Sequence, residues 1–267
     1  MKKSFLLLAG LILLAFTACQ NDELVNGGSG NETAVSFSVQ LPGANAPSTR
    51  AAGDGTQVNR CIMEIYLGDK LYGERQVVPV DDKTATFNVR LVTSQTYDFV
   101  FWADVCGEGG IKADRHYQTA NGLQNISLLG NYAGNDDSRD AFTGVLLSKL
   151  VTGAFNEAVE LTRPFGQLNI KTTDLESIPT DRTALIPATA SLAFKGVYKG
   201  FNAHTGAVTG DLAALSYNEN AAVVDGDGAL TMDYLFAPKE GQLLTNMVLT
   251  MNNAAGEKIT DKELSNI

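Results

Sequence analysis

The chain has 267 residues, with 20 Lys plus Arg against 30 Asp plus Glu and a formal net charge of −10 at pH 7. Because a chain this acidic has no basic stripe to neutralise phosphates, it is not expected to bind nucleic acid. Its 26 glycines and 7 prolines, and its short apolar segments bounded by Gly, Asn and Asp, are typical of an all-β protein.

Residues 1–18 have the three parts of a secretory signal: two lysines, an apolar run from Phe5 to Phe16, and small residues before Cys19. The run is about 12 residues long, shorter than the roughly 20 that a transmembrane helix needs. Thr17-Ala-Cys19 resembles the lipobox of bacterial lipoproteins, in which the cysteine is acylated and becomes the mature amino terminus. The alternative is an ordinary secreted protein with a chance cysteine at this position.

Residues 19–34 are polar and glycine-rich and are predicted to form a flexible tether. The acidic residues in Gln20-Asn-Asp-Glu23 resemble surface-export signals on lipoproteins of one Gram-negative lineage. The chain is therefore expected at the cell outer membrane, held by its lipid anchor and exposed on the surface rather than facing the periplasm.

A first block of strand-length segments is predicted to form an N-terminal domain over residues 35–160. Val35–Leu41 alternates apolar and polar residues and predicts a half-buried strand. Residues 123–128 fit either a strand or a loop. In residues 140–149 a short helix capped by Asp140 competes with a strand. The other strands of this block are expected at residues 62–67, 85–91 and 97–103.

A second block predicts a C-terminal domain over residues 161–267, after a hinge at Arg163-Pro164. Two domains are preferred over one large sandwich for a chain of this length. Its strands are expected at residues 159–170, 190–195, 232–236 and 247–251, and its tight turns at residues 204–206, 225–228 and 255–256.

The two remaining cysteines, Cys61 and Cys106, are an even number in an oxidising compartment. A disulfide between them is one interpretation, and two unrelated buried thiols are the other. The sequence does not fix whether their Cα atoms come within the roughly 4.4–6.8 Å that a bridge requires.

The sequence contains no convergent set of catalytic residues, so we expect no enzyme, no cofactor and no metal site. His116 and His204 have no second His or Cys at metal-ligand spacing and are expected in loops or the core. Gly-x-Ser-x-Gly, P-loop and dinucleotide motifs are absent from the sequence. The carboxylate pairs Asp136-Asp137 and Asp225/Asp227 are expected in solvated turns. Trp102 and Tyr97 could stack on a sugar, but the apolar strand around Trp102 favours a core position.

Leu161-Thr-Arg-Pro-Phe-Gly-Gln-Leu-Asn-Ile170 resembles the start of the second domain in fimbrillin-like lipoproteins, the subunits of type V pili. Four further segments resemble the same family in the expected order, so that the resemblance covers nearly the whole mature chain. It implies two transthyretin-like β-sandwich domains in tandem, export as a lipoprotein, and assembly with other pilus subunits by β-strand addition. These segments are residues 99–104, 140–144, 201–206 and 233–238.

The same resemblance makes Arg50, followed by Ala51, the site that a surface protease would cut. Cutting there would remove strand 35–41 and linker 42–55 together with the lipid. The loss of a central strand leaves unpaired N–H and C=O groups and apolar pockets, which a strand of another subunit can fill. The alternative is an uncut linker arginine, as in an anchor or tip subunit.

Members of the family usually continue beyond the final segment Glu263–Ile267. The C-terminal domain is therefore expected to be truncated and to lack its donor strand.

Two functions remain open from the sequence. The first is a fimbrial subunit or adhesin that acts on a host or biofilm surface through an unknown ligand. The second is a surface glycan-binding lipoprotein of a nutrient-uptake system. An exposed row of Trp and Tyr would favour glycan binding, whereas buried rings would favour the pilus subunit.

Overall fold

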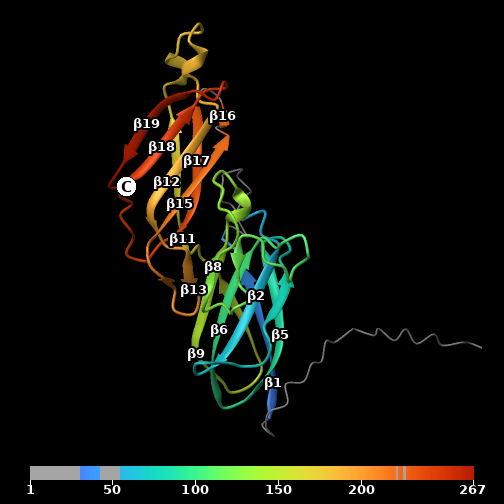
Figure 1. The fold of residues 1–267 in the computed structure, drawn as a ribbon. Helices are drawn as coiled ribbons and strands as arrows, with labels where there is room; N and C mark the ends of the chain where they lie inside the picture. The colour runs from blue at the N-terminus through green and yellow to red at the C-terminus, as the bar shows by residue number, and fades with distance from the viewer. Residues whose placement is uncertain (1–30, 43–54, 221, 225–226) are drawn as a thin grey trace, which may run out of the picture.

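The computed structural model describes residues 31–42, 55–220, 222–224 and 227–267. Its strands form two stacked bodies, and Figure 1 shows the first body below the second. The strands of the first body are β1 (Glu32–Gln40), β2 (Arg60–Leu67), β3 (Lys70–Leu71), β4 (Gln76–Pro79), β5 (Thr84–Val92), β6 (Gln95–Asp104), β7 (Tyr117–Gln118), β8 (Ile126–Leu128), β9 (Phe142–Val151) and β10 (Phe155–Glu160).

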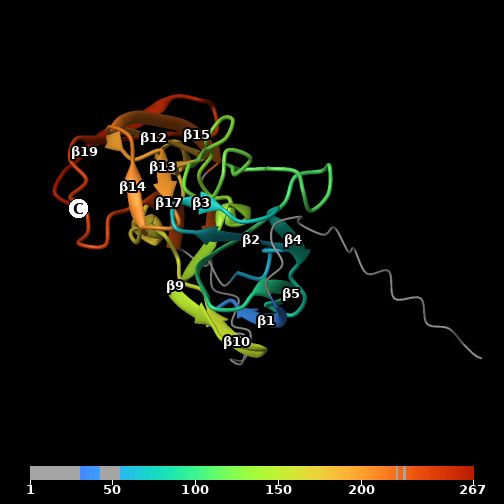
Figure 2. The ribbon, with the colours of Figure 1, turned by 90° about the horizontal axis from the view of Figure 1, so that it is seen from below.

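The first body is a sandwich of two sheets with strand orders β10-β1-β5 and β3-β2-β6-β9, and β4 also pairs with β2. Alternating residues of β1 and β5 face its core, because successive side chains of a strand point to opposite faces. In β6 both faces are buried: Phe99 and Phe101 face this core, whereas Val100 and Trp102 point away from it. Figure 2 shows β1 between β5 and β10.

The second body is a sandwich of sheets β11-β17-β16 and β15-β12-β18-β19 around a separate core. Its strands, together with the hairpin β13–β14, are β11 (Phe165–Thr172), β12 (Thr189–Val197), β13 (Gly200–Asn202), β14 (Ala207–Thr209), β15 (Ala213–Asn220), β16 (Ala222–Val224), β17 (Asp227–Phe236), β18 (Met247–Asn252) and β19 (Lys258–Leu264).

The two bodies are joined by a shared sheet and a shared apolar cluster. Strand β8 of the first body pairs with β13 in the sheet β14-β13-β8-β7. Trp102 and Ile62 from the first body pack in one buried cluster with Phe201 and Phe236 from the second. The predicted all-β class, with two β-sandwiches in tandem, is confirmed. The exact domain boundaries stay a prediction.

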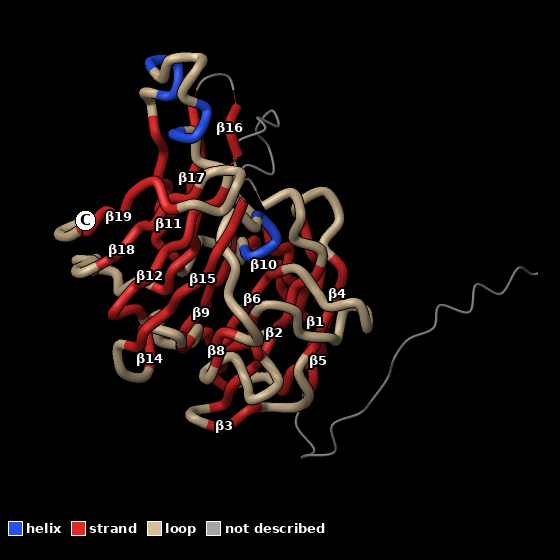
Figure 3. Tube along the Cα trace, turned by 45° about the horizontal axis from the view of Figure 1, so that its top comes forward, coloured by secondary structure: helices blue, strands red, loops and turns tan. Residues whose placement is uncertain are grey.

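The helix predicted as one alternative for residues 140–149 is wrong, because the segment from Phe142 onward forms strand β9. A single helical turn, η1 (Asp137–Arg139), precedes it and is capped by Asp136, whose carboxylate accepts from the Ser138 N–H at 3.0 Å. Asp140, the expected cap, instead forms an ion pair with Arg163 at 2.7 Å. Figure 3 shows the other helical turns, η2 (Leu175–Ser177) and η3 (Thr183–Leu185), at the far tip of the second sandwich.

Three other local predictions are refined by the structure. Of residues 123–128 only the end forms a strand, β8, and the segment expected as one strand over residues 159–170 is divided between β10 and β11. The turn residues Gly206 and Gly256 adopt φ of 69° and 79°, as tight reversals require. The turn predicted at residues 225–228 lies partly outside the described residues. In the described part of the chain, no helix is both long enough and apolar enough to cross a membrane.

Candidate functional site

Strand β1 is paired along both of its edges. It runs antiparallel to β5, from Glu32 opposite Val92 to Gln40 opposite Thr84, and parallel to β10, from Val35 opposite Phe155 onward. The pairing continues past its end, where the N–H of Leu41 donates to the Lys83 carbonyl at 2.9 Å. Removal of β1 would therefore leave two rows of unpaired backbone groups facing each other.

The inward side chains of β1 fill the centre of the first core. Val35, Phe37 and Val39 of β1, and Leu41 directly after it, are at most 2% exposed. The Phe37 ring packs against the rings of Phe99 at 4.6 Å, Phe101 at 5.6 Å and Phe155 at 6.0 Å between centroids. Full burial of four such side chains contributes on the order of 6–12 kcal/mol as an upper estimate. The strand is thus a large share of the core that it completes.

The opposite face of β1 is polar and makes only surface contacts. The Ser36 hydroxyl donates to the Asn156 side chain of β10 at 2.5 Å. Glu32 pairs with Arg90 of β5 at 3.3 Å, in an exposed ion pair of small energetic value. The inward apolar row therefore dominates the binding of this strand to the rest of the molecule.

The residues predicted for lipidation and processing, Cys19, Arg50 and Ala51, lie outside the described residues. The structure describes the chain on both sides of the predicted cleavage site, up to Pro42 shortly after β1 and again from Gly55 onward. Gly55 has φ +72° and packs so closely on Phe142 that an added Cβ would lie 3.0 Å from its ring.

The two other predicted site residues, Cys61 and Cys106, are free thiols, so the disulfide considered from the sequence is not present in the structure. Cys61 is fully buried in the first core, and this burial raises the pKa of its thiol. Cys106 is held by its backbone, whose N–H donates to the Asn59 side chain at 2.9 Å.

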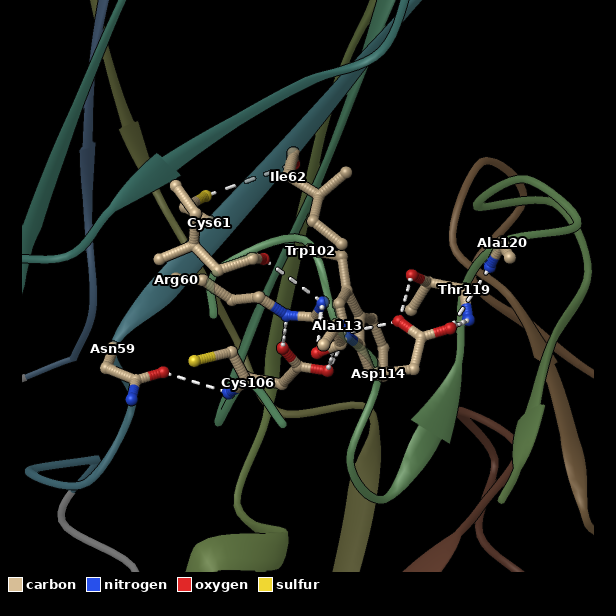
Figure 4. Close-up of polar contacts among 12 residues, drawn as sticks. Asn59, Arg60, Cys61, Ile62, Trp102, Cys106, Ala113, Asp114, Thr119 and Ala120 are labelled. Atoms are coloured by element: carbon tan, nitrogen blue, oxygen red, sulfur yellow. Dashed lines mark hydrogen bonds and ion pairs between the residues drawn. The ribbon is translucent and has the colours of Figure 1, made fainter. Parts of the chain in front are cut away.

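A buried polar network around Arg60 was not predicted from the sequence. Arg60, at the start of β2, is 1% exposed and donates to both carboxylate oxygens of Asp104 at the end of β6, at 2.5 and 3.0 Å (Figure 4). It also donates to Asp114 at 2.9 Å and to two backbone carbonyls of the same loop. The Trp102 indole N–H donates to Asp104 at 3.0 Å.

This network holds a loop in place and leaves no donor of Arg60 free for a ligand. Burial on its own raises the pKa of Asp104, and the contacts with Arg60 and Trp102 offset this only in part. Burial also acts to raise the pKa of Asp114, but its hydrogen bonds with Thr119 and the Arg60 guanidinium hold it below the usual value. The sequence shows only that Arg60 and Asp104 each flank an apolar segment, and their pairing appears first in the register of β2 and β6.

His116 lies beside a serine and an aspartate but not in a catalytic arrangement. Its Nε2 is 2.7 Å from the Ser138 hydroxyl and 3.4 Å from Asp136. A Ser-His-Asp triad needs the serine and the carboxylate on different ring nitrogens, whereas here both face Nε2. Burial, aided by the charge of Arg139, lowers the pKa of His116 to about 4. Ser138 is 3% exposed and donates to Asp136 at 2.5 Å, so it is not a poised nucleophile.

His204 connects the two sandwiches. It lies in the turn between β13 and β14, where its Nε2 is 2.8 Å from Asp98 of β6 and its Nδ1 is 2.9 Å from the Gln124 amide. Its ring stacks on Tyr66 of β2 at 4.9 Å. Both ring nitrogens are thereby occupied by structural partners. Across the residues that the structure describes, no three His, Cys, Asp or Glu side chains are grouped so as to hold a metal ion.

The aromatic side chains of the described residues are buried or half-buried. Trp102 and Tyr97, the candidates for stacking on a sugar, are 0% exposed, so the predicted core position of Trp102 is confirmed. The exposed large apolar side chains are all aliphatic. A shallow polar hollow lined by Asn125, Lys199, Thr209 and Asp211 has no aromatic ring in its lining.

A model of a family described as a family of unknown function, DUF6562, matches residues 27–267. No curated protein matches the chain.

Several solved structures have a backbone fold similar to that of this chain. The fimbrial anchor protein Mfa2 from Porphyromonas gingivalis is 14% identical, with 87% of this chain and 83% of that chain covered and a TM-score of 0.48. A fimbrilin (FimA) from the same organism is 14% identical, with coverages of 85% and 74% and a TM-score of 0.47. A presumed polysaccharide-binding protein from Bacteroides thetaiotaomicron is 12% identical, with coverages of 88% and 80% and a TM-score of 0.49. At these sequence identities and TM-scores, the similarity assigns no function to this chain.

Proposed function

The chain belongs to the family of unknown function DUF6562, and we propose that it is a cell-surface lipoprotein that serves as a fimbrial subunit or adhesin and assembles by donor-strand exchange. In this proposal the chain is exported, acylated on Cys19 and held at the outer membrane. It is not an enzyme, and its partners are other pilus subunits.

The observation that carries the proposal is the position of β1. This strand is central in its sheet, supplies, together with Leu41 directly after it, four nearly fully buried apolar side chains, and is connected to the rest of the chain through the segment that contains Arg50. A cut after Arg50 would convert β1 from part of the chain into a separate peptide held by two edges and an apolar row. Such a strand can be replaced by one from another subunit with the same alternation.

The buried aromatic rings support this proposal over the glycan-binding alternative. Stacking on sugars would need ring faces open to solvent, and the described part of the chain has none among its exposed large side chains. Among the described residues, no aromatic ring is placed to stack on a sugar.

The proposal is tested on the full-length protein extracted from its native cells. We expect a ladder of bands on a denaturing gel that collapses on boiling, with mature amino termini at Ala51. An Arg50→Ala variant should instead give a single acylated band that begins at Cys19, whereas the matched variant Arg90→Ala, at an arginine 62% exposed, should keep the ladder. A single uncut band from the natural sequence would contradict assembly by donor-strand exchange.

A further inference from the structure

Four exposed leucines lie at one end of the first sandwich, and we call this region the leucine end. Leu67 closes β2, Leu71 lies in β3, and Leu147 and Leu150 lie in β9; their exposed fractions are 38%, 48%, 54% and 54%. Large aliphatic side chains with such high exposed fractions are rarely gathered in one part of a protein surface.

The strand register places these leucines in the same few rows of the sheet. Tyr66, next to Leu67, stands opposite both Asp98 and Leu71, and Leu150 stands opposite Thr96 near the start of β6. Leu147 lies in the β-bulge of β9, where Ser148 has φ 54° and its N–H donates to Asp98 at 2.6 Å. The leucine end is therefore the end of the sheet where β6 begins.

The N-terminal segment enters the sandwich at the same end. Glu32 begins β1 opposite Val92, and the carbonyl of Asn31 accepts from the Thr93 N–H at 3.0 Å. The next residue, Ser94, donates its N–H to the carbonyl of Val151, the last residue of β9. Figure 1 shows this end of the first sandwich pointing away from the second sandwich.

The length of the preceding segment limits how far this end can be from a membrane anchor. The chain between Cys19 and Asn31 can span at most about 40 Å even when fully extended. A lipid on Cys19 would thus keep the leucine end, where the chain enters the first sandwich, within that distance of the bilayer. Beside the leucines, Lys149 pairs with Glu157 at 2.5 Å, and the turn between Leu67 and Leu71 carries the opposite charges of Asp69 and Lys70. These neighbouring charges therefore come in pairs of opposite sign, although the whole chain is acidic.

We propose that the leucine end rests on the outer surface of the lipid bilayer while the chain is anchored, with Leu67, Leu71, Leu147 and Leu150 entering the boundary between headgroups and acyl chains. This inference rests on the lipidation in the proposed function and adds a defined orientation to it. Apolar side chains are stabilised by leaving water, and the lipid boundary lies within reach of the tether. The second sandwich is then held away from the membrane, toward its partners.

The test uses tryptophan reporters, because the chain has one natural tryptophan, Trp102, and it is fully buried. Leu147→Trp and Leu150→Trp each place a reporter in the leucine end. The control is Leu185→Trp, at a leucine 45% exposed in η3 at the far tip. The full-length acylated variants are reconstituted into vesicles of phosphatidylethanolamine and phosphatidylglycerol with brominated acyl chains, and flotation with the vesicles is measured in parallel.

We expect all three variants to float, and the two reporters in the leucine end to be quenched by the bromines at least about twofold more strongly than the control, since they would lie within the 5–10 Å depth of an interfacial contact. Flotation with equal quenching would overturn the inference and leave the anchor intact. Failure to float would overturn the anchor and the inference together. A blue shift that grows with protein concentration in the absence of lipid would identify a second copy as the occupant and also overturn it.

Discussion

Asp233 is a fully buried carboxylate in β17 and is sensitive to pH. It accepts a hydrogen bond from the Tyr217 hydroxyl of β15 at 2.7 Å, and the hydroxyls of Tyr132 and Thr231 also face it. The Arg139 charge acts on it from η1. Burial raises the pKa of Asp233 to about 6, because these groups only partly replace the water that an ionised carboxylate loses.

A raised pKa for an acid has a defined effect on the free energy of unfolding. The folded chain binds the Asp233 proton more tightly than the unfolded chain, whose pKa is near 3.8. The stability that the protonated group contributes is therefore fully present below about pH 4 and is lost as pH rises through about 6. The rise of the Asp233 pKa from 3.8 to about 6 corresponds to about 3 kcal/mol in the free energy of unfolding.

We expect Asp233→Asn, which keeps the shape and removes the ionisation, to be as stable as the natural chain near pH 4 and more stable by up to about 3 kcal/mol at pH 7. Urea unfolding at the two pH values measures this difference. Asp261→Asn is the control: Lys258 holds the pKa of this exposed carboxylate below its usual value, so the difference from the natural chain should stay constant over this range. A constant difference for Asp233→Asn as well would contradict the prediction.

Single residues were predictable from the sequence where local pattern decides their position. The apolar run around Trp102 was enough to place this residue in the core. The partners of Arg60 and His204 were not predictable, because they lie far away along the chain: Asp98 and His204 are 106 residues apart. Asp233 meets Tyr217 of the opposite sheet, a pairing that no local pattern reports. Local patterns report which side chains are buried, but not which buried polar groups meet.

At the scale of elements, the strand β1 was predictable from the sequence, but one of its partners was not. Its alternation predicted a half-buried strand, and the structure confirms it. Its parallel pairing with β10 could not be predicted, because residues 36 and 156 are far apart along the chain and meet only when β10 joins β1 in the folded sheet. In residues 140–149 the possible cap Asp140 allowed a helix, whereas the segment pairs with the sheet edge beside β6 as strand β9.

The place of β1 can be tested with a peptide. Cleavage of the purified chain after Arg50, followed by denaturation and removal of the released segment, should leave a chain that refolds poorly. We expect a peptide of residues 31–42 added during refolding to restore the fold and raise the melting temperature, because it supplies both paired edges and the buried row. The control peptide with Phe37→Glu should fail, since it would bury a charge among three aromatic rings. Equal rescue by both peptides would contradict the proposed role of the apolar row.

At the scale of the whole molecule, the two sandwiches share a buried interface. The sequence predicted a hinge at Arg163-Pro164, but this segment is held: Arg163 pairs with Asp140, and the Pro164 carbonyl accepts from the Ala237 N–H at 3.5 Å. The sequence did contain one sign of the interface. Residues 99–103 are apolar on both faces, as in a strand covered from both sides, but the pattern does not name the covering partner.

Trp102 reports directly on this interface. Its indole lies 6.3 Å from the Phe201 ring, which in turn stacks on Phe236 at 5.5 Å. Because the interface cluster and the β8–β13 pair join the sandwiches, we expect the natural chain to unfold in urea as one unit, with the Trp102 fluorescence and far-ultraviolet circular dichroism transitions superimposed.

Phe201→Ala should lower the stability by about 3–5 kcal/mol and move the Trp102 transition to lower urea than the circular dichroism transition, because the interface would open while both cores persist. Phe87→Ala removes a ring that is 1% exposed in the first core and is the matched control. It should cost a similar amount but keep the two transitions together, since the loss falls inside one sandwich. Separate transitions in the natural chain would mean that the sandwiches unfold independently and that the interface contributes little to their coupling.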